Sequence, residues 1–133
     1  MKSSLLILML FLTFSCIKSN GEYIEKENLV IYYDVEEDKA YAEKLMDFWI
    51  DNKYSGKRKQ YLKISRSEDN KTYHIKVIMR SEFKPEDITF EEIQLFNEIQ
   101  ERLNKTVFIK KPCQIAVCDS HFKILNIPNP IKP

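Results

Sequence analysis

The chain has 133 residues, with 21 basic and 20 acidic side chains and a formal net charge of +1. This balance excludes a protein built to hold nucleic acid, because neutralising phosphates requires an excess of clustered lysine and arginine. The chain has only two glycines, Gly21 and Gly56. It therefore lacks the glycine-rich loops that bind nucleotide phosphates, and we predict no cofactor.

The amino terminus has the pattern of an export signal. Lys2 precedes an apolar run over residues 5–14, which ends at Ser15 and Cys16. A positive residue, a short apolar segment and a small residue before the cleavage point are typical of a secretory signal peptide. A membrane-spanning helix needs roughly 18 consecutive apolar residues, and Lys18 interrupts this run too early. We therefore assign residues 1–15 to a signal peptide that takes no part in the fold.

The end of this signal, Leu12-Thr13-Phe14-Ser15-Cys16, resembles the lipobox of bacterial lipoproteins. Thr13 and Phe14 depart from the usual leucine and small residue, but the Phe-Ser-Cys ending is similar to that of Bacteroidetes lipoproteins. The resemblance implies that Cys16 carries diacylglycerol and becomes the first residue of the mature protein. Two or three acyl chains would hold the protein on a membrane, because each buried CH₂ contributes about 0.8 kcal/mol. In the alternative, cleavage near Glu22 leaves a secreted or periplasmic soluble protein.

Removal of the signal peptide leaves a chain of single-domain length. It takes away Lys2, so that 20 basic residues face 20 acidic ones, and a chain of this size normally forms one core. Residues 16–27 are polar and short of apolar groups, which predicts a lipidated tether. Residues 28–127 form the predicted α+β domain. Three prolines in residues 128–133 predict an extended tail over the surface.

Hydrophobic periodicity within the domain alternates between two-residue and helical spacing. Thr89 and Glu92 form a capping box before the second helical segment, and residues 106–109 fit either a helix or a strand. In chain order the predicted elements are a strand at residues 29–33, a helix at 36–53, a hairpin of strands at 60–65 and 72–80, a helix between Pro85 and Pro112, and a hairpin of strands at 113–118 and 122–127.

The resulting order, βαββαββ, resembles the ferredoxin-like two-layer sandwich with an extra edge strand. Right-handed crossovers would place both helices on one face of a mostly antiparallel sheet. The Leu-Val-Ile-Tyr-Tyr-Asp start at residues 29–34, the basic loop after the first helix and the closing hairpin at residues 118–125 are similar to small exported Bacteroidetes lipoproteins of unknown function. That resemblance implies a fold and an envelope location, and it implies no reaction.

Two helices can cover only one face of such a sheet. Side-chain alternation then places Val30, Ile78, Gln114, Ala116 and Cys118 on the uncovered face, together with five candidate partner-binding residues. Tyrosine rings and lysines suit a protein partner. In the alternatives, the tail or tether folds over this face, or the face is an ordinary amphipathic sheet surface. The candidates are Tyr32, Tyr61, Lys63, His74 and Lys76.

The reactive groups form no catalytic or metal signature. Cys113 and Cys118 are five residues apart in one predicted strand, roughly 16 Å, whereas bridged Cα atoms lie about 4.4–6.8 Å apart, so we predict no disulfide. Their spacing with His121 matches no zinc motif. Two glycosylation sequons, at Asn70 and Asn104, would matter only in a eukaryotic protein.

The sequence therefore predicts a non-enzymatic envelope lipoprotein, anchored through lipid on Cys16, that binds a protein partner through the uncovered sheet face or loops. One alternative is a thiol-dependent enzyme that uses Cys118 and His121. A second is a secreted soluble inhibitor or immunity-type protein.

Overall fold

A computed structural model describes residues 20–78 and 84–132. The predicted signal peptide, residues 1–15, and the predicted acylation site Cys16 lie outside the described residues, as do the last two residues of the strand predicted at 72–80. The helices are α2 (Lys39–Asp51) and α3 (Phe90–Thr106), with single 3₁₀ turns at Glu36–Asp38 and Pro85–Asp87. The strands are β1 (Glu22–Lys26), β2 (Leu29–Tyr33), β3 (Gln60–Arg66), β4 (Tyr73–Ile78), β5 (Cys113–Cys118) and β6 (Ile124–Asn126).

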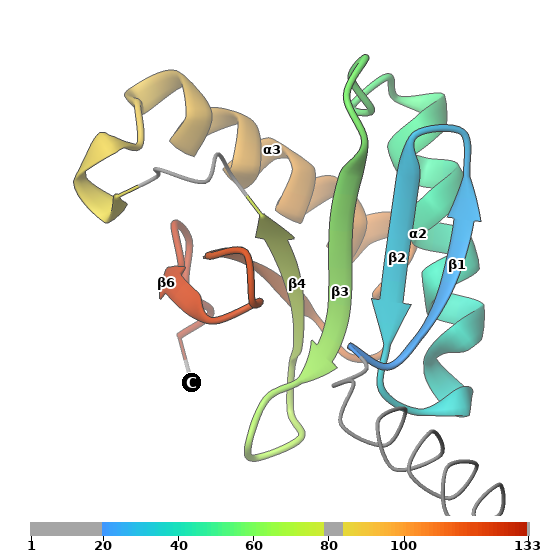
Figure 1. Ribbon diagram of the computed structural model, residues 1–133. Helices are drawn as coiled ribbons and strands as arrows, with labels where there is room; N and C mark the ends of the chain where they lie inside the picture. The colour runs from blue at the N-terminus through green and yellow to red at the C-terminus, as the bar shows by residue number, and fades with distance from the viewer. Residues whose placement is uncertain (1–19, 79–83, 133) are drawn as a thin grey trace, which may run out of the picture.

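The six strands form one mixed sheet in sequential order, β1-β2-β3-β4-β5-β6. The pairs β2–β3 and β4–β5 are parallel, and the other three are antiparallel. A parallel pair requires a crossover; α2 supplies it between β2 and β3, and α3 between β4 and β5. Both helices lie on the same face of the sheet, behind it in Figure 1.

The α+β content agrees with the sequence, but the ferredoxin-like βαββαββ order on a mostly antiparallel sheet is wrong. Each helix joins strands that are direct neighbours in the sheet, so no other strand lies between them. An additional strand, β1, also precedes the predicted first strand, within the segment 16–27 that we had assigned to a tether. β1 was missed because an edge strand has little to bury: only Ile24 packs against the core.

The core lies between the helices and one face of the sheet. α2 contributes Leu45, Met46 and Trp49, and α3 contributes Phe96, Ile99 and Leu103, all buried. Every second residue of the four central strands faces them, as strand alternation requires. The sheet residues of this core are Leu29, Ile31, Tyr33, Leu62, Ile64, Tyr73, Ile75, Val77, Cys113, Ile115 and Val117.

One carboxylate is buried in this frame. Asp38, at the start of α2, is 1% exposed. The guanidinium of Arg66, at the end of β3, donates from Nε and Nη2 to its two oxygens at 3.3 and 3.1 Å. The hydroxyl of Tyr73, at the start of β4, donates to Oδ1 at 2.9 Å. Burial, and after it this hydrogen bond, raise the pKa of Tyr73 to about 12, and the carboxylates of Asp38 and Glu37 raise the pKa of Arg66. Asp38 therefore joins α2, β3 and β4 at one end of the sheet.

Helix α3 begins at the predicted cap and also closes the edge of β5. Thr89 Oγ1 accepts the Glu92 N–H at 3.1 Å, and the helix ends at Thr106, so residues 107–109 continue neither a helix nor a strand. Asn104 accepts the N–H of Cys113 at 2.7 Å and donates to its carbonyl at 3.0 Å. Gln100 accepts the N–H of Ile115 at 2.9 Å. The two hydrogen bonds to Cys113 give Asn104 a structural role, which accounts for an asparagine at the position of the sequon.

Gly21 lies directly before β1, and Gly56 is a matched control for a test of the backbone conformation there. Gly21 has a φ of 102°, and a Cβ there would lie 2.7 Å from the backbone oxygen of Tyr33, whereas a Cβ on Gly56 would meet nothing within 4 Å. We expect Gly21→Ala to lower the free energy of unfolding by about 1–3 kcal/mol. Gly56→Ala should leave it unchanged or raise it slightly. Urea denaturation of both variants measures the difference; equal stability would contradict this account of Gly21.

The buried carboxylate has a matched control in its neighbour, because Glu37 contacts the same guanidinium from an exposed position at 3.3 Å. We expect Asp38→Asn to lower the free energy of unfolding by about 3 kcal/mol, since it leaves Arg66 without its buried counter-charge. Glu37→Gln should cost less than about 1 kcal/mol. Thermal and urea unfolding of the two variants would decide this, and equal losses would show that burial of Asp38 is not the source of its contribution.

Candidate functional site

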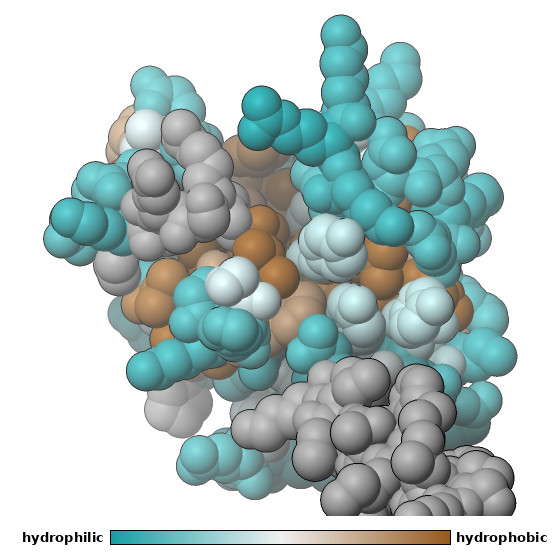
Figure 2. Space-filling view, viewed as in Figure 1, coloured by the Kyte–Doolittle hydropathy of each residue, from teal (hydrophilic) through white to brown (hydrophobic). Residues whose placement is uncertain are grey.

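The face of the sheet opposite the helices carries a row of side chains in register. Tyr23 pairs with Tyr32, Tyr32 with Lys63, Lys63 with Lys76, and Lys76 with Ala116. All five predicted partner-binding residues lie on this face, since Tyr61 is paired with Val30 and His74 with Ser65 in the adjacent rows. In Figure 2, apolar and intermediate surface lies in the middle of this face, and hydrophilic surface lies above it and on either side.

An aromatic cluster forms one part of this face. The rings of Tyr23 and Tyr32 are 5.7 Å apart, and Phe122 packs edge-on against Tyr32 at 5.8 Å. Tyr23 is 58% exposed and Tyr61 38% exposed, whereas Tyr32 is half-buried and Phe122 buried. The cluster therefore combines an exposed tyrosine, Tyr23, with a packed base of Tyr32 and Phe122, an arrangement that gives rigid contact area at low entropic cost.

Phe122 was missed by the sequence analysis, although a signal for it was present in the turn before it. Asp119 Oδ1 accepts the N–H groups of His121 and Lys123, each at 2.9 Å, and these bonds lower the pKa of Asp119. The tight turn holds Phe122 at a φ of 61°, and its ring lies over the sheet. Aspartate is a residue type that favours turns, but where the turn places the Phe122 ring depends on the strand pairing.

Two lysines lie directly opposite each other beside the aromatic cluster. Lys63 forms an ion pair with Asp34 at 3.1 Å, and its ammonium is 6.0 Å from the centre of the Phe122 ring. Lys76 is half-buried; after burial, its charge is the second cause that lowers the pKa of His74, and it partly offsets the rise that burial produces in the pKa of Cys118. Within residues 20–78 and 84–132, no carboxylate pairs with Lys76. Its charge is therefore uncompensated in the part of the chain that the structure describes.

The β5 side of this face is covered, so the expectation of a wholly uncovered face is wrong there. Ala116 and Cys118 are buried, and the backbone N–H of Ile131, in the tail, donates to the Gln114 side chain at 2.9 Å. Strand β6 and the tail lie on the viewer's side of β4 and β5 in Figure 1. Val30, predicted on the uncovered face, is also buried, at 3% exposure. The accessible part of the face consequently consists of exposed and half-buried side chains on β1, β2 and β3 and the adjoining Lys76.

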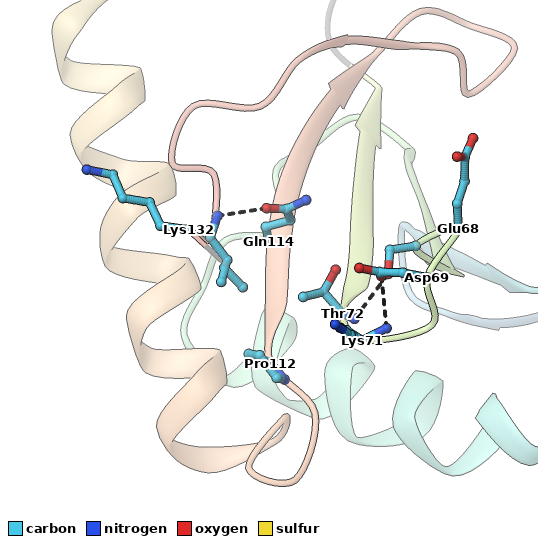
Figure 3. Close-up of a pocket in the computed structure, with 9 residues that line it drawn as sticks. Glu68, Asp69, Lys71, Thr72, Pro112, Gln114 and Lys132 are labelled. Atoms are coloured by element: carbon cyan, nitrogen blue, oxygen red, sulfur yellow. Dashed lines mark hydrogen bonds between the residues drawn. The ribbon is translucent and has the colours of Figure 1, made fainter.

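A cleft of about 740 Å³ lies between the β3–β4 turn and the tail. Figure 3 shows Gln114 and Thr72 at this cleft, with the Lys132 side chain pointing away from the turn. Asp69 is occupied within the turn: it accepts from Ser67 Oγ at 2.7 Å and from the Lys71 N–H at 3.1 Å, and its pKa is lowered. The lining residues are Ser67, Glu68, Asp69, Lys71, Thr72, Pro112, Gln114, Ile131 and Lys132.

The cysteines do not form a reactive centre. Cys113 and Cys118 are both free and buried, and burial raises their pKa values to about 12 and about 11. Cys118 Sγ donates to the Ala116 carbonyl at 3.5 Å, whereas His121 is exposed in the Asp119 turn. The geometry does not bring Cys118 and His121 together as a nucleophile and base. Over the described ranges, no group of three or more potential ligands could hold a metal ion.

Comparison with protein families, curated proteins and solved structures finds no match to this chain. Among the described residues, neither helix has the length and apolar composition needed to cross a bilayer.

The burial of the thiols predicts slow chemistry at neutral pH. With a pKa of about 11, about one Cys118 in 10,000 is a thiolate at pH 7. We expect Cys113 and Cys118 to resist a thiol reagent in the folded protein and to react within minutes in denaturant. Peptide mapping after labelling identifies the modified cysteine, and fast native labelling of Cys118 would contradict the structure and revive the thiol-enzyme alternative.

Proposed function

We propose that this protein is a non-catalytic binding module, exported and held on a membrane by lipid on Cys16, that binds an acidic segment of a partner protein. The binding surface is the aromatic–lysine patch, which consists of Tyr23, Tyr32, Tyr61, Lys63, Lys76 and Phe122.

The uncompensated Lys76 is the observation that carries this proposal. Like charges directly opposite each other in a sheet are destabilising, and Lys63 and Lys76 are such a pair. Asp34 offsets the charge of Lys63 at 3.1 Å, but no described carboxylate does so for Lys76. A carboxylate from a partner would complete the arrangement, and complementary charge favours both fast encounter and correct orientation.

The aromatic side chains give the same surface a second kind of contact. Tyr61 and Tyr23 are exposed beside the lysines, and tyrosine is enriched in interface cores because it joins a large apolar ring to a polar hydroxyl. A partner segment with carboxylates and apolar side chains would therefore match the patch in both charge and surface character.

A lipid anchor would allow the patch to bind a partner even if its affinity in solution is modest. Confinement to a membrane surface raises the effective concentration of the domain beside partners in the same membrane. The signal-like residues 1–15 and Cys16 support this part of the proposal. Mass spectrometry of the mature amino terminus tests it directly: Cys16 should be the first residue and should carry the mass of diacylglycerol, and a free thiol on an internal Cys16 would remove the anchor.

Site-specific crosslinking tests the binding surface. A photoreactive phenylalanine analogue at position 61, introduced into the full chain in its native membrane, should capture a specific protein. The same analogue at position 90 is the control, because Phe90 is 68% exposed but belongs to α3, on the helix side of the sheet. We expect Lys76→Glu to reduce the yield at position 61 at least tenfold, and Lys44→Glu, an exposed change on α2, to leave it unchanged. Equal capture at positions 61 and 90, or capture unaffected by Lys76→Glu, would refute the patch.

A further inference from the structure

Two glutamine side chains tie the C-terminal tail to the domain by its backbone. Gln100 Nε2, on α3, donates to the carbonyl of Asn129 at 2.9 Å. Gln114 Oε1, on β5, accepts the N–H of Ile131 at 2.9 Å, a bond drawn in Figure 3. Residues 127–132 form no helix or strand, so these two amides supply the hydrogen bonds that a strand ladder would otherwise provide.

The amide nitrogen of the Gln114 side chain faces a histidine. Gln114 Nε2 lies 2.9 Å from His74 Nε2, across the parallel β4–β5 pair. The backbone N–H of Ile131 can only donate, so it determines which end of the Gln114 amide is the oxygen. Gln114 must then present its NH₂ to His74, and Nε2 of the imidazole must accept. The docked tail therefore requires a neutral His74 that carries its proton on Nδ1.

The surroundings of His74 favour this neutral form. His74 is half-buried, and burial is the largest cause that lowers its pKa, followed by the charge of Lys76 on the same strand; Asp69, in the β3–β4 turn, acts in the opposite direction. On β3 the residue opposite is Ser65, which is uncharged and whose buried Oγ has no hydrogen-bond partner among the described residues. From β5 and the tail, His74 meets the Gln114 amide, and the Lys132 side chain points away from the β3–β4 turn.

We propose that residues 130–132 act as a proton-controlled strap, which is docked while His74 is neutral and is released from the sheet when His74 gains a proton, so that the cleft beside the β3–β4 turn opens, whereas the Gln100–Asn129 bond continues to hold the chain before it.

Hydrogen-bond polarity explains the release. A protonated imidazole carries hydrogen on both nitrogens, so Nε2–H would point at the NH₂ group of Gln114. Rotation of the amide by half a turn would offer Oε1 to His74, but it would then place NH₂ against the N–H of Ile131. One of the two bonds must be lost in either case, and rotation towards the charged imidazole is favoured because hydrogen bonds to charged groups are stronger.

The direction of the pH dependence follows from the hydrogen-bond polarity. Because the docked strap requires Nε2 of His74 to accept a hydrogen bond, the docked state binds fewer protons at His74 than the released state does. Burial and the charge of Lys76 lower the pKa of His74 from its ordinary 6.5, so the strap is docked at neutral pH and docking weakens as the pH falls below about 6.5. This behaviour needs no partner, so it is independent of the binding function proposed above.

Nuclear magnetic resonance of the full chain in detergent micelles tests the strap. The Ile131 amide and the His74 ring should report transitions with the same midpoint below pH 6.5. Hydrogen exchange of the Ile131 amide, corrected for its intrinsic pH dependence, should rise about fivefold or more at acidic pH, the effect of one net hydrogen bond. The chain has only two histidines, so His121→Gln, at the exposed turn position, is a matched control that should leave this transition intact.

Two further variants make the result decisive. His74→Gln presents a carbonyl to Gln114 but cannot be protonated, so the strap should stay docked across the whole range. Gln114→Leu removes the hydrogen bonds of Gln114 to His74 and to Ile131, so the Ile131 amide should exchange fast at every pH. A transition at Ile131 that persists in His74→Gln, or an Ile131 amide that stays protected while the His74 ring titrates, would overturn the proposal.

Discussion

The arrangement of the two layers depends on the buried carboxylate of Asp38. Taking an ion out of water costs several kcal/mol, and the cost is offset here because Arg66 and Tyr73 together occupy both carboxylate oxygens. The contact joins the start of α2 to one end each of β3 and β4, so α2 can begin at only one place relative to the sheet. Such a pair contributes positional specificity more than net stability, since an apolar replacement of similar volume would avoid the desolvation cost.

Near the β6 edge of the sheet, side-chain amides from α3 and β5 form hydrogen bonds with backbone groups of β5 and the tail. β6 is short and pairs only with the end of β5, so the remaining backbone groups of β5 need other partners. Asn104 and Gln100, one helical turn apart on α3, bind Cys113 and Ile115. Gln100 and Gln114 then bind the tail. The tail is consequently held by the same helix that closes the edge, and its hydrogen bond to Gln114 ties it to the outer face of the sheet.

Local patterns predicted the elements but not their neighbours. The strand at residues 29–33, the one at 113–118 and the cap at Thr89 appear as expected, because alternation and capping chemistry act within a few residues. Pairing depends on contacts distant in sequence, and so the strand order was wrong and β1 was missed. Alternation also placed the five candidate residues on one face. It could not show that Phe122 and the tail cover part of that face, nor that Asp38 is a buried ion rather than a charge at a helix start.

Lys76 belongs to the aromatic–lysine patch and also acts electrostatically on His74, which controls the strap. The ammonium of Lys76 is one of the causes that lower the pKa of His74. An acidic group bound at Lys76 would offset that charge, and the pKa of His74 would rise towards its ordinary value. Because coupling between two sites is reciprocal, a proton on His74 would strengthen the binding of the acidic group to the same extent. Partner binding at β1–β3 and release of the tail from β5 would then favour each other, through electrostatics across the sheet and without movement of either helix.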